Sequence, residues 1–146
     1  MTTAIDTNVL SAIWSHEPGA TELGRLLQDL SRDGALIVSA PVWAELGAGP
    51  DVGPVLCTKL LRALGIRIEM ELSRKAWELA AEAFAAYAIR RRSAGVGQPR
   101  RLLADFLVGA HAVDKADRLV SMDGRFYRSV FPGLALVELP TSAGAY

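Results

Sequence analysis

Four acidic residues stand where the chain leaves a predicted strand or enters a predicted helix. Asp6 follows apolar residues in TTAIDTNVL, and Asp123 follows another short apolar run in LVSMDGRF. Glu45 in APVWAEL and Asp105 in RRLLADFLVGAHAV come near the starts of helices. The carboxyl ends of parallel strands meet at one edge of a sheet, where ligands usually bind. The four carboxylates can therefore converge there.

Convergence of four carboxylates calls for a counter-charge. Two like charges about 4 Å apart repel by ~1 kcal/mol in water and ~4 kcal/mol at an effective dielectric constant of 20. Oxygen ligands without neighbouring Cys or His favour Mg²⁺ or Mn²⁺ over Zn²⁺. Such an ion can orient a phosphodiester and activate the attacking water. Taken singly, each acid also fits an ordinary helix cap or a solvated charge, and Asp6 followed by Thr7 and Asn8 is a favourable cap.

Other catalytic arrangements have little support in the sequence. Only His16 and His111 are available for a Ser-His-Asp or Cys-His site. We expect His111 to be packed or hydrogen-bonded rather than catalytic, because it lies six residues beyond Asp105 and off its helical face. Cys57 is interpreted as a small buried side chain. A single cysteine cannot form an internal disulfide, which fits a reducing cytoplasm.

Length and composition predict one soluble globular domain spanning residues 1–146. The chain is 51% hydrophobic, has no repeat or low-complexity run, and is long enough to bury a substantial core. The opening stretch lacks the pattern of a signal peptide. The most apolar segments, 35–44 and 102–113, are too short to span a bilayer. We therefore expect no membrane association.

Positive charge is concentrated in one part of a chain whose formal net charge is zero. Residues 90–128 carry a net charge of +5, so the remainder carries −5. Positive charge concentrated in one region is typical of a surface that binds a polyanion. Arg90, Arg91 and Arg92 also fit a helix end, where the dipole favours cations. Arg100 and Arg101 precede the helix that carries Asp105, so they can bind the phosphates of a polyanion beside a metal.

The elements that must position these residues alternate along the chain. Helix caps, apolar periodicity and Gly/Pro punctuation predict strands at residues 3–5, 35–39, 66–70, 119–121 and 134–139. Helices are predicted at 9–14, 19–33, 41–46, 55–64, from Ser73 to the arginines at 90–92, around 103–113 and at 123–131, with a loop at 95–99. This alternation predicts an α/β fold with a mainly parallel central sheet covered on both faces.

The long helix that begins after Ser73 has its own apolar pattern. Trp77, Ala81, Phe84 and Ala88 recur at spacings of four, three and four residues, which predicts one packed face. We expect Trp77 and Phe84 to lie in the core or at a subunit interface rather than to form a stacking platform.

The sequence resembles the PIN-domain nucleases, and within them the VapC-type toxins of bacterial toxin–antitoxin pairs. IDTNVL at the start, VWAEL in the middle, and RRLLADFLVGAHAV and ADRLVSMDGRFYRSVFPGLALVE at the end carry the resemblance, which runs along the whole chain. The first and last pieces are specific in combination, whereas the middle one alone is weak. The resemblance implies a PIN-like α/β/α sandwich and metal-dependent endoribonuclease activity.

The resemblance also implies roles for particular residues. The four acids of the family pattern fall on Asp6, Glu45, Asp105 and Asp123, and none is missing. Asn8 matches a polar position that helps to organise the site by orienting Asp6 or a metal-bound water. Ser121 stands where such proteins more often have Thr, and either hydroxyl could hold the metal ligands or a phosphate.

The resulting hypothesis is Mg²⁺-dependent hydrolysis of RNA, with Mn²⁺ as an alternative ion. Asp6, Asp105 and Asp123 would be the main metal ligands. Glu45 would bind the ion through water or help to deprotonate the nucleophile. The resemblance further implies a VapB-type antitoxin and a homodimer. Two alternatives stay open: a non-catalytic module that binds RNA or protein, and a Mg²⁺ phosphohydrolase of a small substrate, although DTN offers the latter no adjacent paired acid.

Overall fold

The computed structural model describes residues 1–95 and 100–140. Its strands are β1 (Thr3–Ile5), β2 (Leu36–Ser39), β3 (Ile66–Glu69) and β4 (Arg118–Val120). Its helices are α1 (Thr7–Trp14), α2 (Ala20–Asp33), α3 (Ala40–Gly47), α4 (Gly53–Ala63), α5 (Arg74–Ala94), α6 (Leu103–Lys115) and α7 (Gly124–Val130). Apart from Gly95, the loop predicted at 95–99 lies outside the described residues. None of the helices in the described part of the chain is long and apolar enough to cross a membrane.

The four strands form one parallel sheet in the order β3-β2-β1-β4. Ala4 of β1 is in register with Ile37 of β2 on one side and with Leu119 of β4 on the other. The two central strands, β1 and β2, are buried along their whole length, as expected for a parallel sheet covered on both faces. This arrangement confirms the predicted α/β class and the parallel sheet.

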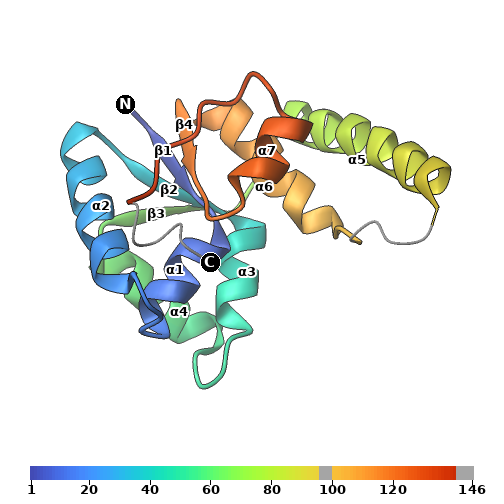
Figure 1. Cartoon of the computed structure of the whole chain (residues 1–146). Coiled ribbons are helices and arrows are strands. Elements are labelled where there is room, and N and C mark those ends of the chain that lie inside the picture. Colours follow the sequence, from blue (N-terminus) through green and yellow to red (C-terminus); the bar gives the residue numbers. More distant parts are fainter. Residues whose placement is uncertain (96–99, 141–146) are drawn as a thin grey trace.

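The strand order determines which helices cover each face. The chain steps from β1 to β2 to β3 in one direction and then returns across the sheet to β4. Because such crossovers are right-handed, the helices before β3 lie on one face, and α5 and α6 lie on the opposite face. Figure 1 shows α2 and α4 on one side of the sheet and α5 and α6 on the other. The carboxyl ends of β1 and β4 consequently face the start of α6.

The packed face of α5 differs from the predicted one. Ala76 and Ala80 are buried, while the side chain of Trp77 is 49% exposed. Phe84 and Tyr87 are the aromatic residues of α5 that pack on α6, with ring centroids 5.0 and 5.3 Å from that of Phe106. Small alanines allow α5 to approach α6 closely, and this turns the larger indole of Trp77 outwards. Phe84 therefore packs in the core as predicted, whereas Trp77 does not lie in the core of the single chain. The alternative that Trp77 lies at a subunit interface stays a prediction.

The strand predicted at 134–139 is not formed. Only one parallel bridge, between Leu119 and Leu136, joins this segment to β4. Leu119 donates its N–H to the Ala135 carbonyl and accepts from the Val137 N–H, both at 2.9 Å. Alternate residues of a strand direct their backbone groups to opposite neighbours. Strand β4 has only three residues, and the backbone groups of the outer two point towards β1. Leu119 is therefore the one residue of β4 that can pair with the segment 134–139.

Gly109 provides a test of the packing around α6. A Cβ at this position would overlap the ring of Phe131 and press on Tyr127. We expect Gly109→Ala to lower the free energy of unfolding by about 1–3 kcal/mol, because an overpacked core forces its neighbours to shift. Gly24→Ala in α2 is the matched control, since a Cβ there meets no atom within 4 Å and should stabilise the helix by about 0.5–1 kcal/mol. Urea denaturation measures both, and stabilisation by both substitutions would contradict this packing.

Candidate active site

Asp6 lies at the junction of β1 and α1 and serves both as a helix cap and as a buried charge. Its backbone is extended, and its Oδ1 accepts the N–H of Thr7 at 2.8 Å. Its Oδ2 accepts the hydroxyls of Ser121 at 2.7 Å and Tyr127 at 3.0 Å. Burial raises the pKa of Asp6, and the charge of Asp105 adds to this, against the lowering by the three hydrogen bonds. The carboxylate is therefore only partly compensated by its own surroundings.

The loop after β4 is tied to β1 through Ser121 and Asn8. Besides donating to Asp6, the Ser121 Oγ accepts the N–H of Asp123 at 2.9 Å. The Asn8 side chain donates to the same oxygen at 3.4 Å and accepts the N–H of Met122 at 3.1 Å. Asn8 thus contacts the loop and reaches Asp6 only through Ser121. Its proposed role in orienting Asp6 is indirect in this arrangement.

Glu45 reaches the site from α3. Its Oε1 accepts the hydroxyl of Thr7 at 2.9 Å. Partial burial raises the pKa of Glu45, and the charges of Asp6 and Asp105 raise it further. The hydrogen bond from Thr7 lowers it. Ser39 caps α3 and has the one buried side-chain oxygen in the described residues that lacks a hydrogen-bond partner. The carboxyl ends of β1 and β2 therefore both contribute polar groups to this edge.

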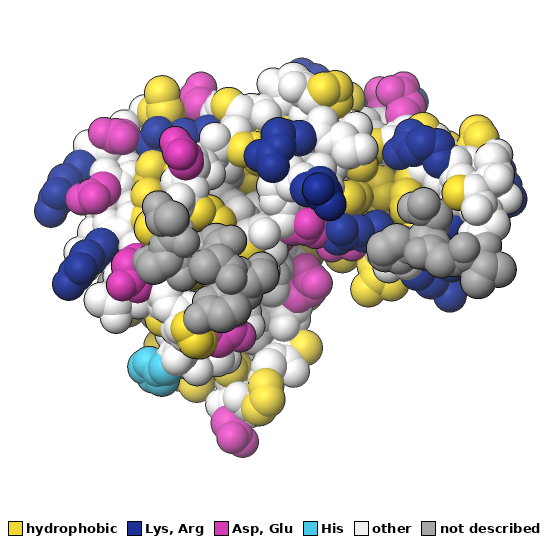
Figure 2. Space-filling model, in the orientation of Figure 1, with side chains coloured by type: hydrophobic (Ala, Val, Ile, Leu, Met, Phe, Trp, Pro, Cys, Tyr) yellow, Lys and Arg dark blue, Asp and Glu magenta, His cyan; other side chains and the backbone are white. Residues whose placement is uncertain are grey.

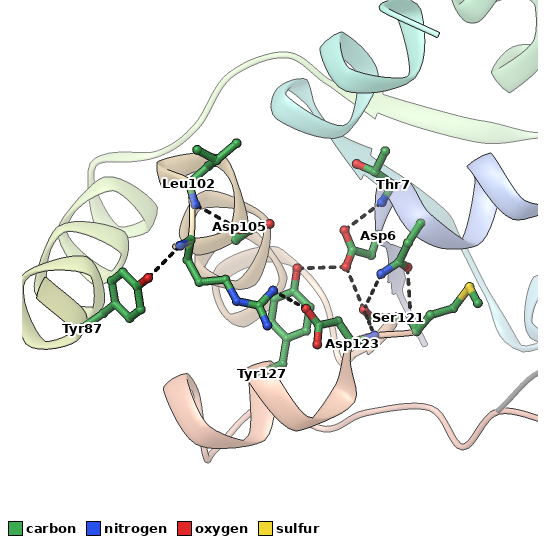
Figure 3. Close-up of polar contacts among 11 residues, drawn as sticks. Asp6, Thr7, Tyr87, Leu102, Asp105, Ser121, Asp123 and Tyr127 are labelled. Atoms are coloured by element: carbon green, nitrogen blue, oxygen red, sulfur yellow. Dashed lines mark hydrogen bonds and ion pairs between the residues drawn. The ribbon is translucent and has the colours of Figure 1, made fainter. Parts of the chain in front are cut away.

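Asp105 and Asp123 complete the set of acids from the other side of the sheet. The Asp105 Oδ2 accepts the N–H of Leu102 at 3.2 Å, which places this carboxylate at the beginning of α6. Asp123 precedes α7, and its Oδ2 pairs with the guanidinium of Arg101 at 2.5 Å. Arg101 also lies over the ring of Phe126, 4.4 Å from its centroid. Figure 3 shows Asp105 pointing towards Asp6, with Asp123 and Tyr127 beside them.

The four acids are thus neighbours in the fold, although they do not form a closed metal cage. Asp6 and Asp105 each raise the pKa of Glu45, and Asp6, Asp105 and Asp123 all contribute to the raised pKa of Tyr127. Within residues 1–95 and 100–140, no three acidic, His or Cys side chains are arranged to hold one ion, and Asp123 is already paired with Arg101. The oxygen donors and their uncompensated charge suit a hard divalent cation in chemical terms.

The remaining residues singled out in the sequence lie around this centre. Arg100 is exposed, and it lines a hollow of about 210 Å³ together with Arg91 and Arg92. His111 is buried in α6, with its Nε2 2.8 Å from the Glu69 carboxylate, so it is hydrogen-bonded as predicted. Cys57 is buried, and burial raises the pKa of its thiol, which keeps it protonated.

Sequence reasoning missed two hydroxyl donors that hold the acids. Tyr127 donates to Asp6, and Thr7 donates to Glu45. Burial raises the pKa of Tyr127, followed by the charge of Asp6, so the phenol stays protonated and acts as a donor. The Tyr in GRFYRSV gives no local signal, because its partner is 121 residues away in the sequence. Thr7 follows Asp6 directly but does not indicate a contact with Glu45.

The family model for the PIN domain matches residues 3–131, which include all four acids and both hydroxyl donors. The chain belongs to the PIN domain family. PIN domains are generally nucleases that use divalent metal ions. The match confirms the resemblance identified from the sequence motifs. No curated protein matches the chain closely enough to count as a relative.

Solved structures with a similar fold come from toxin–antitoxin complexes. VapBC2 from Rickettsia felis, crystallised with a DNA fragment of its promoter, has a TM-score of 0.67 and 23% identity over 96% of this chain and 100% of that one. VapBC-1 from nontypeable Haemophilus influenzae has a TM-score of 0.61 and 13% identity, covering 94% and 98%. FitAcB from Neisseria gonorrhoeae has a TM-score of 0.61 and 18% identity, covering 93% and 96%. At these identities the similarity establishes the shared PIN fold.

The Ser121 hydroxyl offers a direct test of how the site is held. Ser121→Ala leaves an oxygen of buried Asp6 and the N–H of Asp123 without this partner, which should lower the free energy of unfolding by about 1–3 kcal/mol. Ser121→Thr keeps the hydroxyl and should stay much closer to the original stability. Urea denaturation of the three proteins measures the difference. Equal losses for Ala and Thr would indicate that the hydroxyl contributes little.

Proposed function

We propose that this PIN domain is a Mg²⁺-dependent endoribonuclease and the toxin component of a toxin–antitoxin pair. The observation that carries the proposal is the buried, partly compensated carboxylate of Asp6, with Glu45 and Asp105 within electrostatic range. Such a concentration of acids at the carboxyl end of a parallel sheet costs stability unless a cation binds there. Membership of a family of metal-dependent nucleases supports the same chemistry.

The proposed roles follow from how each acid is held. Asp6 and Asp105 present carboxylate oxygens from the end of β1 and the start of α6, so both can bind the ion directly. Asp123 is the third proposed ligand, and because Arg101 pairs with its Oδ2, its Oδ1 is the oxygen proposed to bind the ion. Glu45, fixed by Thr7, binds through water or takes a proton from the attacking water. When bound, Mg²⁺ supplies charge stabilisation for the phosphodiester and lowers the pKa of water.

The hydroxyl donors keep the acids in place during this chemistry. Ser121 and Tyr127 both donate to the Asp6 Oδ2, so the other carboxylate oxygen, which accepts only from the Thr7 backbone, has the lighter hydrogen-bond load. Asn8 holds the loop that carries Asp123. Arg100 and Arg101 are proposed to bind RNA phosphates. When the substrate binds, the Arg101 guanidinium would leave the Asp123 carboxylate and pair with a phosphate instead.

The proposed partners are a VapB-type antitoxin and a second copy of the chain. The similar solved structures include toxin–antitoxin complexes, which supports a protein inhibitor of this kind. An arginine from an antitoxin would pair well with the acidic centre, since Arg and carboxylate can bind bidentately. Exposed Trp77 and Met70 border an apolar hollow of about 440 Å³, which supports burial of this face in a homodimer. The reducing cytoplasm is the proposed location.

The nuclease proposal predicts cleavage of RNA that depends on both the metal and the acids. Antitoxin-free protein should cut a mixed RNA pool with Mg²⁺ or Mn²⁺, and EDTA should stop it. Asp105→Ala and Asp6→Asn should each reduce the cleavage rate by at least a hundredfold, because each removes a proposed ligand. Gel analysis of the products gives the rate and the cut sites, and circular dichroism verifies that each variant is folded.

The alternatives make different predictions in the same assay. A small-substrate phosphohydrolase would hydrolyse a generic phosphate ester and leave RNA intact. A non-catalytic module would bind RNA or protein and cut nothing. Full RNA cleavage by a folded Asp6→Asn protein would contradict the assigned mechanism.

The dimer proposal predicts that Trp77 is covered by a second copy. Trp77→Ser removes a large apolar contact and should shift the protein from dimer to monomer in light scattering coupled to gel filtration. Ile89→Ser is the matched control, because Ile89 is an exposed apolar side chain of the same helix that does not line the hollow. A monomeric unsubstituted protein, or equal effects of both substitutions, would count against this face.

A further inference from the structure

A second polar groove opens directly beside the acidic centre, between α5 and α7. It has a volume of about 280 Å³, and its lining includes Tyr87, Arg90, Arg101, Asp123, Arg125 and Ser129. Asp123 and Arg101 belong to the active site as well, so the groove and the metal centre share one wall. The groove and the acidic centre are therefore contiguous at Asp123 and Arg101.

The charges in the groove leave a positive excess. Arg101 is paired with Asp123, the only acid that lines the groove. Arg90 and Arg125 are exposed, and neither forms an ion pair or a side-chain hydrogen bond with another described residue. Two guanidinium groups are thus available on opposite sides of the groove, one from α5 and one from α7. Their donors match the paired oxygens of a phosphate.

Helix-end electrostatics do not account for these two arginines. The last turn of α5 contains Arg91 and Arg92, and Arg90 lies before it. Arg125 is in the first turn of α7, where the helix dipole disfavours a cation. Figure 2 shows Lys and Arg side chains gathered on the side of the molecule formed by α5 and α7, next to acidic side chains. The carboxylate nearest to Arg125 along the chain is that of Asp123, the N-cap of α7, and it is paired with Arg101.

We propose that the groove between α5 and α7 binds the phosphate backbone of the RNA strand next to the scissile phosphate, through Arg90 and Arg125. This inference rests on the proposed endoribonuclease function and extends it by assigning the path of the substrate. A single strand that passes Asp123 encounters Arg101 first and then Arg90 and Arg125. Tyr87 accepts the backbone N–H of Arg101 at 2.7 Å, which positions the entrance to the groove. Contacts to phosphates carry no base information, so this groove adds affinity rather than sequence specificity.

The test compares the double variant Arg90→Ala/Arg125→Ala with a control that loses the same charge elsewhere. Arg25→Ala/Lys59→Ala is suitable, because both residues are exposed and lie on α2 and α4, on the other face of the sheet. Single-turnover cleavage of one mapped RNA oligonucleotide, measured over a range of protein and salt concentrations, separates binding from the chemical step. Thermal melting verifies that all proteins are folded.

The groove variant should need roughly tenfold more protein for half-maximal cleavage at low salt, because two charge-assisted contacts are lost. Its maximal rate should stay close to that of the unsubstituted protein, because the acids are untouched. The slope of log affinity against log salt should become shallower by about 1.4, or roughly 0.7 for each phosphate contact on a single strand. The Arg25/Lys59 control should change neither value appreciably.

Three results would overturn the inference, and they differ in what they imply. If the groove variant and the control have the same half-saturating concentration and salt slope, the groove does not bind RNA, while the nuclease assignment stands. If the unsubstituted protein neither binds nor cuts RNA, the proposed function and the groove assignment both fail. A lower maximal rate with unchanged half-saturation would also refute a binding role for the two arginines.

Discussion

The structure depends on one buried carboxylate that is shared by two neighbouring strands. Asp6 is 8% exposed and ends β1, yet two of its three hydrogen bonds come from the segment after β4, more than a hundred residues later. A buried charge of this kind must be hydrogen-bonded, so the contacts to Ser121 and Tyr127 connect the two ends of the fold. The same contacts determine where the loop carrying Asp123 lies. The position of the proposed metal centre is thus coupled to the pairing of β1 with β4.

The acids lie in an environment that leaves their charge only partly balanced. Burial and mutual repulsion raise the pKa of both Asp6 and Glu45, and hydrogen bonds from Thr7, Ser121 and Tyr127 oppose this. Among the described residues, Arg101 is the one cation paired with an acid of the centre. It binds Asp123 while lying over the ring of Phe126. This pairing places a guanidinium at the border between the acidic centre and the basic groove. The proposed sites for a divalent cation and for a negatively charged substrate are therefore adjacent.

The fold of this chain is shared with structures of low sequence identity. Structures that share 13–23% of residues with this chain have TM-scores of 0.61–0.67 over nearly its whole length. In this chain the central strands β1 and β2 are buried along their whole length, whereas the polar residues that follow the strands have particular partners.

The sequence by itself determined the alternation of strands and helices, the parallel sheet and the placement of the four acids near one edge of that sheet. It could do so because helix caps, apolar periodicity and short motifs are local signals. It placed Asp6 at the end of β1 and His111 in a packed environment, both of which the structure has. Tertiary structure alone decided the contacts of Tyr127 and Thr7 with the acids and the pairing of Arg101 with Asp123. It also reduced the last predicted strand to a single bridge and turned Trp77 outwards. The contacts join residues that are far apart in the chain. The single bridge depends on the length of β4, and the direction of Trp77 depends on the close approach of α5 to α6. None of these causes produces a recognisable pattern among neighbouring residues in the sequence.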